Sequence, residues 1–194
     1  MFTRRTRRIA PLACVALLLS LAACGGGGGG GNGGGGGGGS TLALGEQAVV
    51  EHTQIGGGAD APSTTLGITV LAVREGTQAE LSQGGFELDP EEQSRTPYYV
   101  DVRYENQGTA AIERQLDVSL EDQDGNLITA TTIISLGGPP FEQCPNINEG
   151  ELAPGESYES CTLFLVPEGS QPGKVSFLPY DPESETEFVY WDVA

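Results

Sequence analysis

The amino-acid sequence predicts an all-β fold, an antiparallel β-sandwich of about eight strands, and three observations support this fold class. Apolar residues after residue 45 recur at every second position more clearly than at every third or fourth. Glycine, proline and asparagine lie between the alternating segments, where tight turns would be needed. No helical periodicity with matching caps stands out after residue 45. We therefore expect residues 46–194 to form one sandwich domain.

The clearest strand is the segment 98–105. In it, Tyr98, Val100, Val102 and Tyr104 are apolar, and the charged residues Asp101, Arg103 and Glu105 alternate with them. This period of two is typical of a strand that buries one face. Seven further segments alternate in the same way or form short apolar runs, and they complete the predicted set: 47–51, 66–72, 116–120, 127–136, 161–165, 174–178 and 187–193.

Turn residues lie where a sandwich needs its chain reversals. The Asp-Gly-Asn segment at 124–126 suits a tight hairpin, because glycine and asparagine accept a positive φ. The Pro-Gly pair at 154–155 suits the second and third positions of a turn. The Asn-Gln-Gly segment at 106–108 closes the strand 98–105. These turns favour antiparallel neighbours.

Four motifs carry a resemblance to a known family: YYVDVRYENQG at 98–108, LEDQDG at 120–125, LAPGE at 152–156 and LFLVPEG at 163–169. They resemble the immunoglobulin-like, telokin-like domain of unknown function found in many Gram-positive lipoproteins. The resemblance covers roughly residues 64–193 and implies an immunoglobulin-like sandwich. An insertion around residues 139–150 departs from the family pattern.

The first 23 residues have the order of parts of a cleavable signal peptide. Residues 1–8 carry four arginines, and residues 9–23 are mostly apolar. The apolar run is shorter than the roughly 20 residues that span a bilayer, and glycines follow it, so a permanent membrane helix is disfavoured. The paired arginines leave the general secretory and twin-arginine export routes both open.

The Leu-Ala-Ala-Cys ending of this segment, at 21–24, resembles the lipobox of bacterial lipoproteins. The resemblance implies that Cys24 is lipidated, becomes the mature N-terminus and anchors the protein at the outer face of the cell membrane. The alternative is a small residue that happens to follow an ordinary cleavage site. Every residue from 25 to 39 except Asn32 is glycine, so the segment 24–45 is predicted to be a disordered, flexible tether.

The charge of the chain excludes one class of partner. The sequence has 9 basic and 27 acidic residues, a formal net charge of −18. Cleavage before Cys24 removes four arginines and no acid, which leaves five basic residues and a net charge of −22. Such a surface repels phosphate backbones and anionic headgroups, so we expect no nucleic-acid partner.

Cys144 and Cys161 are the other two cysteines of the mature chain, and export would place them in an oxidising compartment. We expect them to form a disulfide. A metal site and a redox pair are the alternatives. Zinc would need four ligands and copper would favour methionine or histidine near the sulfur, whereas the mature chain has His52 as its single histidine and no methionine. Redox pairs normally have the closer C-x-x-C spacing.

Candidates for catalysis are few. A nucleophile system would depend on His52, and a lone histidine in a predicted edge strand is more often a surface residue than a base. Asp89, Glu91 and Glu92 supply carboxylates of the kind that cleave glycosidic bonds. In a chain with 27 acids, however, such clusters arise from composition alone. Trp191 is interpreted as a core residue.

A calcium-like pattern also has a simpler explanation. Asp122, Asp124 and Asn126 imitate the start of a calcium loop, but Ile133 occupies the twelfth position, where a carboxylate is needed. The hairpin interpretation explains the same residues. Weak divalent binding at the acidic segments 89–92 and 181–187 remains an alternative to a solvated acidic surface.

The sequence thus predicts a membrane-anchored, extracytoplasmic lipoprotein without catalytic residues, metal or cofactor. Its sandwich is expected to be a binding or accessory module for an envelope protein or an extracellular ligand. The alternative is a passive spacer lipoprotein without a specific ligand, and an enzyme is the third choice. Because fold does not determine function, the ligand itself is not predicted.

Overall fold

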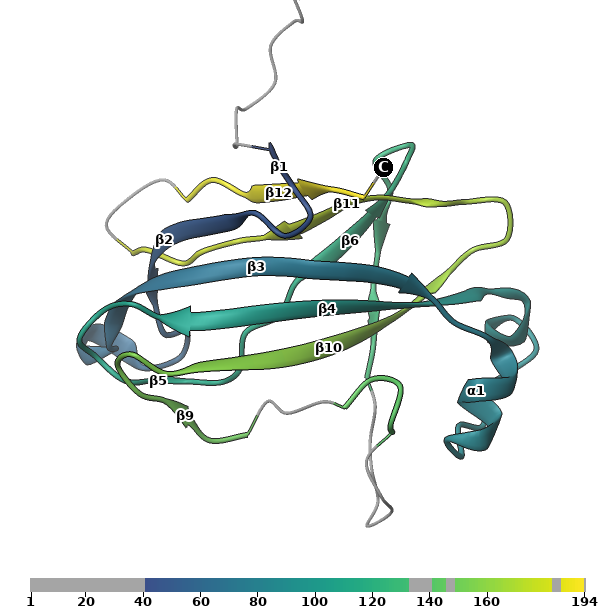
Figure 1. The fold of residues 1–194 in the computed structure, drawn as a ribbon, viewed down its shortest axis with the longest axis horizontal. Coiled ribbons are helices and arrows are strands. Elements are labelled where there is room, and N and C mark those ends of the chain that lie inside the picture. Colours follow the sequence, from purple (N-terminus) through teal and green to yellow (C-terminus); the bar gives the residue numbers. More distant parts are fainter. Residues whose placement is uncertain (1–40, 133–140, 146–148, 183–185, 194) are drawn as a thin grey trace, which may run out of the picture. The chain divides into compact units, whose positions relative to one another are not determined.

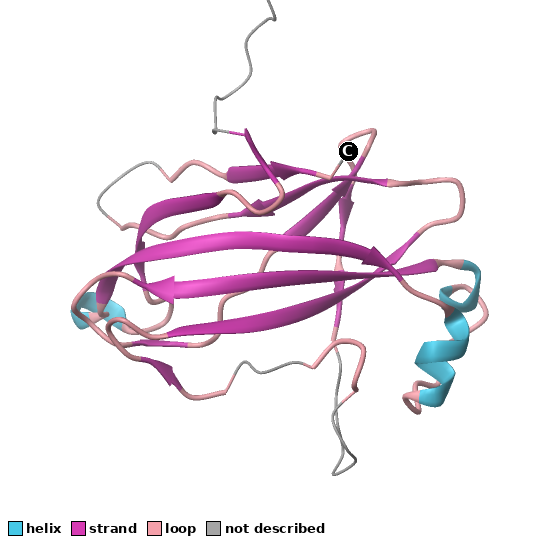
Figure 2. Ribbon diagram, viewed as in Figure 1, coloured by secondary structure: helices cyan, strands magenta, loops and turns pink. Residues whose placement is uncertain are grey.

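The computed structural model of the protein describes residues 41–132, 141–145, 149–182 and 186–193. The predicted signal peptide, Cys24 and all but the last residues of the predicted tether lie outside these ranges, as does the end of the predicted strand 127–136. Strands and loops make up nearly all of the described chain (Figure 2). The predicted all-β fold class is confirmed.

Two five-stranded sheets face each other (Figure 1). Sheet A contains, in spatial order, β1 (Thr41–Ala43), β12 (Val189–Asp192), β11 (Pro172–Phe177), β6 (Ser119–Asp122) and β7 (Leu127–Ile128). Sheet B contains β2 (Gln47–Thr53), β3 (Ser63–Glu75), β4 (Thr96–Asn106), β10 (Ser157–Val166) and β8 (Ala130–Thr131). Neighbouring strands are antiparallel, with the exception of the parallel pair β1 and β12, which the sequence did not predict.

Shorter elements connect the sheets. A two-stranded ribbon pairs β5 (Ile112–Glu113) with β9 (Glu151–Leu152). The helical elements are α1 (Gln78–Gln83) and the 3₁₀ turns η1 (Gly58–Asp60) and η2 (Glu92–Ser94). Figure 2 shows the helical segments at the ends of the sandwich rather than over its middle.

The main core lies between the two sheets. Val102, Tyr104 and Phe164 of sheet B are buried in one cluster with Val175 and Trp191 of sheet A. This arrangement follows from the period of two, because alternate side chains of each strand point to the same face. The indole N–H of Trp191 donates to the Glu46 carbonyl at 2.9 Å, so the ring is buried without an unsatisfied donor. The interpretation of Trp191 as a core residue is confirmed.

The predicted turns form as expected. The Asp122 carboxylate accepts the backbone N–H groups of Asp124 (3.0 Å) and Asn126 (2.8 Å), and this closes the hairpin between β6 and β7. Gly125 has φ 82°, a left-handed conformation that glycine adopts without strain. β4 ends at Asn106, as the Asn-Gln-Gly turn predicted.

Asn106 also joins three segments at one end of the sandwich. Its side chain is fully buried and donates to the carbonyls of Ala110 (2.7 Å) and Leu152 (2.9 Å). Its Oδ1 accepts from the Thr64 hydroxyl at 2.5 Å and from the Gly108 N–H at 3.1 Å. All four hydrogen-bonding positions of the amide are therefore used.

Two local expectations were wrong. The sequence gave no sign of a helix by periodicity, yet α1 forms with Thr77 as its N-cap. The Thr77 hydroxyl accepts the Glu80 N–H, and the Glu80 carboxylate accepts the Thr77 N–H. This capping box is a Thr-x-x-Glu signal that the periodicity analysis overlooked. In addition, β1 lies inside the segment 24–45 that was assigned to the tether, and its Leu42 packs against the main core.

Candidate functional site

Cys144 and Cys161 form a disulfide with Cα atoms 5.1 Å apart, which confirms the predicted pairing. Both cysteines belong to a second apolar cluster on the outer face of sheet B. This cluster contains Leu81, Tyr99, Phe141, Cys144, Cys161, Leu163 and Leu165, with Phe86 and Leu88 packed against it. The Phe141 ring contacts the rings of Phe86 (5.0 Å) and Tyr99 (5.9 Å). The segment 141–145 therefore covers part of the outer face of sheet B.

His52 is placed as a structural residue. It is buried, its Nδ1 accepts the backbone N–H of Tyr180 at 3.3 Å, and its ring packs against Phe177 at 5.8 Å. Burial lowers the pKa of His52 below its ordinary value of about 6.5, so the ring is neutral at pH 7. The expectation of a surface histidine was wrong, because His52 points toward the second sheet rather than toward solvent.

The acidic candidates have structural roles as well. The Asp89 carboxylate accepts the N–H groups of Glu91 and Glu92, both at 2.8 Å, and the Glu92 carboxylate accepts the Asp89 N–H at 2.9 Å. Hydrogen bonds from the side chain and backbone of Asn126 lower the pKa of Asp122. Both arrangements use carboxylates to close turns. Within the described ranges, no group of three or more His, Cys, Asp or Glu side chains is arranged to hold a metal ion.

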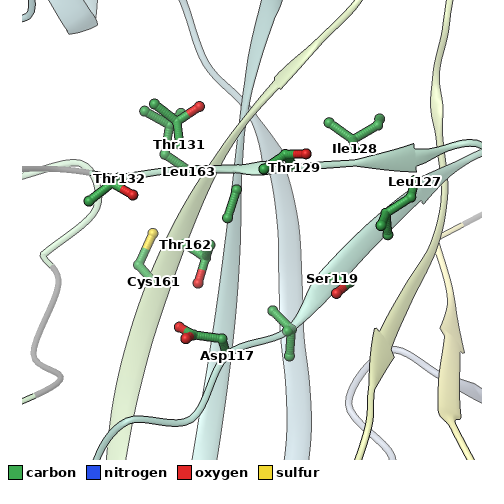
Figure 3. Close-up of a pocket in the computed structure, with 12 residues that line it drawn as sticks. Asp117, Ser119, Leu127, Ile128, Thr129, Thr131, Thr132, Cys161, Thr162 and Leu163 are labelled. Carbon is green, nitrogen blue, oxygen red and sulfur yellow. The ribbon is translucent and has the colours of Figure 1, made fainter.

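A pocket of about 460 Å³ lies beside Cys161 and is drawn in Figure 3. Three segments distant in sequence line it: 117–119, 127–132 and 161–163. The lining hydroxyl residues are Ser119, Thr129, Thr131, Thr132 and Thr162, and the one charged lining residue is Asp117. The remaining lining residues are Val118, Leu127, Ile128, Ala130, Cys161 and Leu163. We call this hollow the hydroxyl pocket.

A change of sheet produces the hydroxyl pocket. The chain leaves sheet A at the end of β7 and joins sheet B at β8 after the single residue Thr129. β8 pairs with β10 at Leu163 and Phe164 only, so the two sheets diverge here. Figure 3 shows the 127–132 segment crossing above β10, with the Asp117 carboxylate directed toward the side formed by Cys161 and Thr162. Threonine is common in such strands because its branched side chain suits a pleated surface.

A neutral phenol lies near the carboxylate of the hydroxyl pocket. Burial, and to a smaller extent the charge of Asp117, raises the pKa of the neighbouring Tyr158 phenol, which therefore stays neutral. The Tyr158 hydroxyl donates to the Arg114 carbonyl at 3.1 Å. Burial also raises the pKa of Tyr104. A pocket of hydroxyls with one carboxylate can donate and accept hydrogen bonds and attract a cation, but none of its lining side chains is basic.

Sequence reasoning did not find the hydroxyl pocket. Its residues are ordinary strand threonines, and no spacing links 117–119 with 161–163. The run Thr-Ala-Thr-Thr at 129–132 was the one available signal, since three threonines within the predicted strand 127–136 are unusual for a core. One lining residue, Cys161, was nevertheless singled out by the sequence, as a member of the predicted disulfide.

The fold was compared with solved structures. MPT63, a secreted protein from Mycobacterium tuberculosis, is 14% identical with a TM-score of 0.49, over 79% of this chain and 97% of that protein. The yjhA protein from Bacillus subtilis is 14% identical with a TM-score of 0.47, over 79% and 99% of the two chains. The ycdA protein from Bacillus subtilis, provisionally named a lipoprotein, is 14% identical with a TM-score of 0.45, over 73% and 38%.

These likenesses assign neither a ligand nor a location to this chain. The sequence matches no protein-family model, and no curated protein matches it significantly. The telokin-like resemblance therefore stays a prediction. In the part of the chain that the structure describes, no helix is long and apolar enough to cross a membrane.

Proposed function

We propose that this protein is an exported, lipid-anchored binding module whose hydroxyl pocket takes a small, uncharged or cationic polar ligand at the outer face of the cell membrane. The observation that carries the proposal is the lining of the pocket: five hydroxyl residues and one carboxylate, with no Lys or Arg. The volume of about 460 Å³ lies within the range of small-molecule sites.

The chemistry of the hydroxyl pocket supports binding rather than catalysis. A hydroxyl becomes a nucleophile when a base removes its proton, and His52 is buried on a different part of the fold, against Phe177 and Tyr180. The Thr162 hydroxyl can instead exchange hydrogen bonds with a hydroxylated ligand. Asp117 can attract an ammonium group, and an anionic ligand would meet repulsion from the same carboxylate.

The proposed location depends on the start of the chain. Lipid on Cys24 would hold the domain to the membrane, and residues 25–40 would serve as the tether. About 16 glycine-rich residues have a typical reach of roughly 20–25 Å, so the domain would sample ligands close to the envelope.

The test is titration of the mature chain with glucose, N-acetylglucosamine, choline and citrate, followed by NMR shifts of the backbone amides. We expect the neutral or cationic probes, and not citrate, to shift residues 117–119, 127–132 and 161–163. Asp117→Asn should abolish choline binding, and Thr162→Val should weaken sugar binding about tenfold or more. Asp60→Asn removes an exposed carboxylate outside the pocket lining and is the matched control.

Two outcomes would contradict the proposal. Binding of citrate in preference to the other probes would show that the Asp117 carboxylate does not repel anionic ligands. Failure of every probe, together with loss of envelope integrity on deletion of the gene and no ligand-dependent phenotype, would favour the spacer role instead.

A further inference from the structure

The outer face of sheet A carries exposed aromatic and aliphatic side chains. Val175 and Phe177 of β11 point into the core, so alternation turns Lys174 and Leu178 to the other side. In the same way, Val189 and Trp191 point inward, and Phe188 and Tyr190 point outward. Leu178 is 45% exposed and Phe188 is 40% exposed. We call the set Lys174, Leu178, Phe188 and Tyr190 the aromatic face.

Three members of the aromatic face, Lys174, Phe188 and Tyr190, are in contact. The Phe188 and Tyr190 rings lie 5.8 Å apart with an interplanar angle of 32°. The Lys174 Nζ lies 5.5 Å from the centre of the Tyr190 ring. The register pairs Ser176 with Tyr190 across the two strands. The Ser176 hydroxyl is buried and has no hydrogen-bond partner within the described residues. The Lys174, Phe188 and Tyr190 side chains are therefore ordered relative to one another, and the buried Ser176 hydroxyl is not accessible to a ligand.

The fold treats its two outer faces differently. On sheet B, α1 and the segment 141–145 cover Tyr99, Leu163 and Leu165. On the aromatic face, Leu178 and Phe188 are exposed, whereas Ser176, which pairs with Tyr190, is buried. Figure 1 shows β11 and β12 in the layer opposite the long strands β3, β4 and β10, away from α1. Exposed apolar side chains that gather on one face are typical of interaction sites.

The charged residues around the aromatic face favour a basic partner. Glu121 and Asp192 lie opposite Lys174 on the two neighbouring strands, and the exposed Glu187 precedes Phe188. The four arginines after residue 23 each form an ion pair with a carboxylate, and Lys174 lies over Tyr190. The few cations of the mature chain are therefore already engaged, while most of its 27 acids are not neutralised. A second copy or an anionic membrane would meet strong repulsion.

We propose that the aromatic face docks a basic segment of another protein, in which arginine or lysine side chains alternate with apolar ones. The apolar side chains would pack on Leu178 and Phe188, and cationic side chains would lie over the Phe188 ring or beside Asp192 and Glu187, because Lys174 already lies over the Tyr190 ring. Association would be accelerated by the field of the acidic domain and would slow as salt is raised. This docking surface is separate from the hydroxyl pocket, so the two proposals stand independently.

The experiment uses the mature chain, residues 24–194, with Cys24→Ser so that no lipid is attached. The probes are three short peptides in which arginine alternates with leucine, arginine alternates with serine, and glutamate alternates with leucine. Calorimetry gives the affinity, and NMR shifts give the binding surface. We expect the arginine–leucine peptide to bind at residues 174–178 and 188–192, more weakly at higher salt, and about tenfold or more tighter than the other two peptides.

Phe188→Ser should weaken binding of the arginine–leucine peptide by about tenfold or more. Val49→Ser is the matched control, because Val49 is 55% exposed on β2 and its loss should leave the affinity unchanged. Leu178→Ser replaces Phe188→Ser if that variant does not fold. Equal binding by Phe188→Ser and the unmodified sequence would overturn the proposal, as would equal binding of both arginine peptides. Binding to phosphatidylcholine vesicles that depends on Phe188 would assign the face to a membrane and also overturn it.

Discussion

Removing the Cys144–Cys161 disulfide tests how the insertion is held to the sandwich. The change is Cys144→Ala with Cys161→Ala, because alanine leaves no buried hydroxyl behind. Both cysteines are buried, with exposed fractions of 0% and 4%, in the cluster that contains Tyr99 and Phe141. The double variant therefore removes a covalent link and two buried sulfur atoms while leaving the main core between the sheets intact.

The expected loss in the free energy of unfolding follows from the spacing of the two cysteines. They are 17 residues apart, and a closed loop of that length stabilises a fold by about 3 kcal/mol in the chain-entropy model. The lost packing of two small buried side chains adds about 1 kcal/mol. For a domain of this size, a loss of about 3–4 kcal/mol corresponds to a fall of roughly 10 °C in the thermal midpoint.

The assay is urea unfolding of the oxidised protein, the reduced protein and the double variant, followed by tryptophan fluorescence. Trp191 reports on the main core, so a shift of its midpoint shows that the whole domain is less stable. The reducing agent should not change the double variant, which serves as the control. A loss below about 1 kcal/mol, or two alkylatable thiols in freshly isolated native protein, would refute the reasoning.

Three further predictions concern the anchor, a buried histidine and a buried amide. The intact mass of membrane-extracted protein should lack residues 1–23 and exceed the bare chain by acylglyceryl groups, and Cys24→Ala should leave the detergent phase; retention there would contradict lipidation. Burial lowers the pKa of His52, so the folded state should be most stable above about pH 6.5 and should lose stability as pH falls below it. Urea midpoints measured against pH should show this decrease for the unmodified sequence and not for His52→Gln. Asn106→Ala should lower the free energy of unfolding by about 2–4 kcal/mol, because it leaves the buried partners of the amide unpaired. Gln107→Ala, at an exposed position, should lower it by less than about 1 kcal/mol, and similar losses in both variants would contradict the role of Asn106.

The parts of the fold that the sequence predicted are those with a local cause. The strand 98–105 was found because one face of β4 contacts the core and the other contacts solvent, which imposes a period of two. The turn at 124–126 was found because Gly125 needs a positive φ that few residues adopt. The disulfide was found from chemistry alone, since an exported chain with two remaining cysteines favours a bridge.

The parts that were missed depend on contacts between distant segments. β1 has three residues and is held by parallel pairing with β12, about 150 positions later, so no local pattern marks it. α1 is too short for periodicity, and Leu81 alone buries it in the second cluster. His52 was expected at the surface because an edge strand exposes one side. Its position on the inward side depends on the register of β2 with β3 and on the Tyr180 contact.

Cys161 belongs both to the lining of the hydroxyl pocket and to the second cluster. The disulfide at Cys161 therefore restricts the conformational freedom of the pocket wall. The Cys161 side chain lines the pocket, while its sulfur is bonded to Cys144, whose segment packs through Phe141 against Phe86 and Tyr99. One wall of the pocket is thus fastened to a cluster outside the main core. A pocket wall held by a covalent bond loses less conformational entropy when a ligand binds, because that entropy is already lost in the free protein. The saving in conformational entropy requires an intact disulfide, which persists in an oxidising compartment. The proposed binding role is therefore linked to the proposed export of the chain.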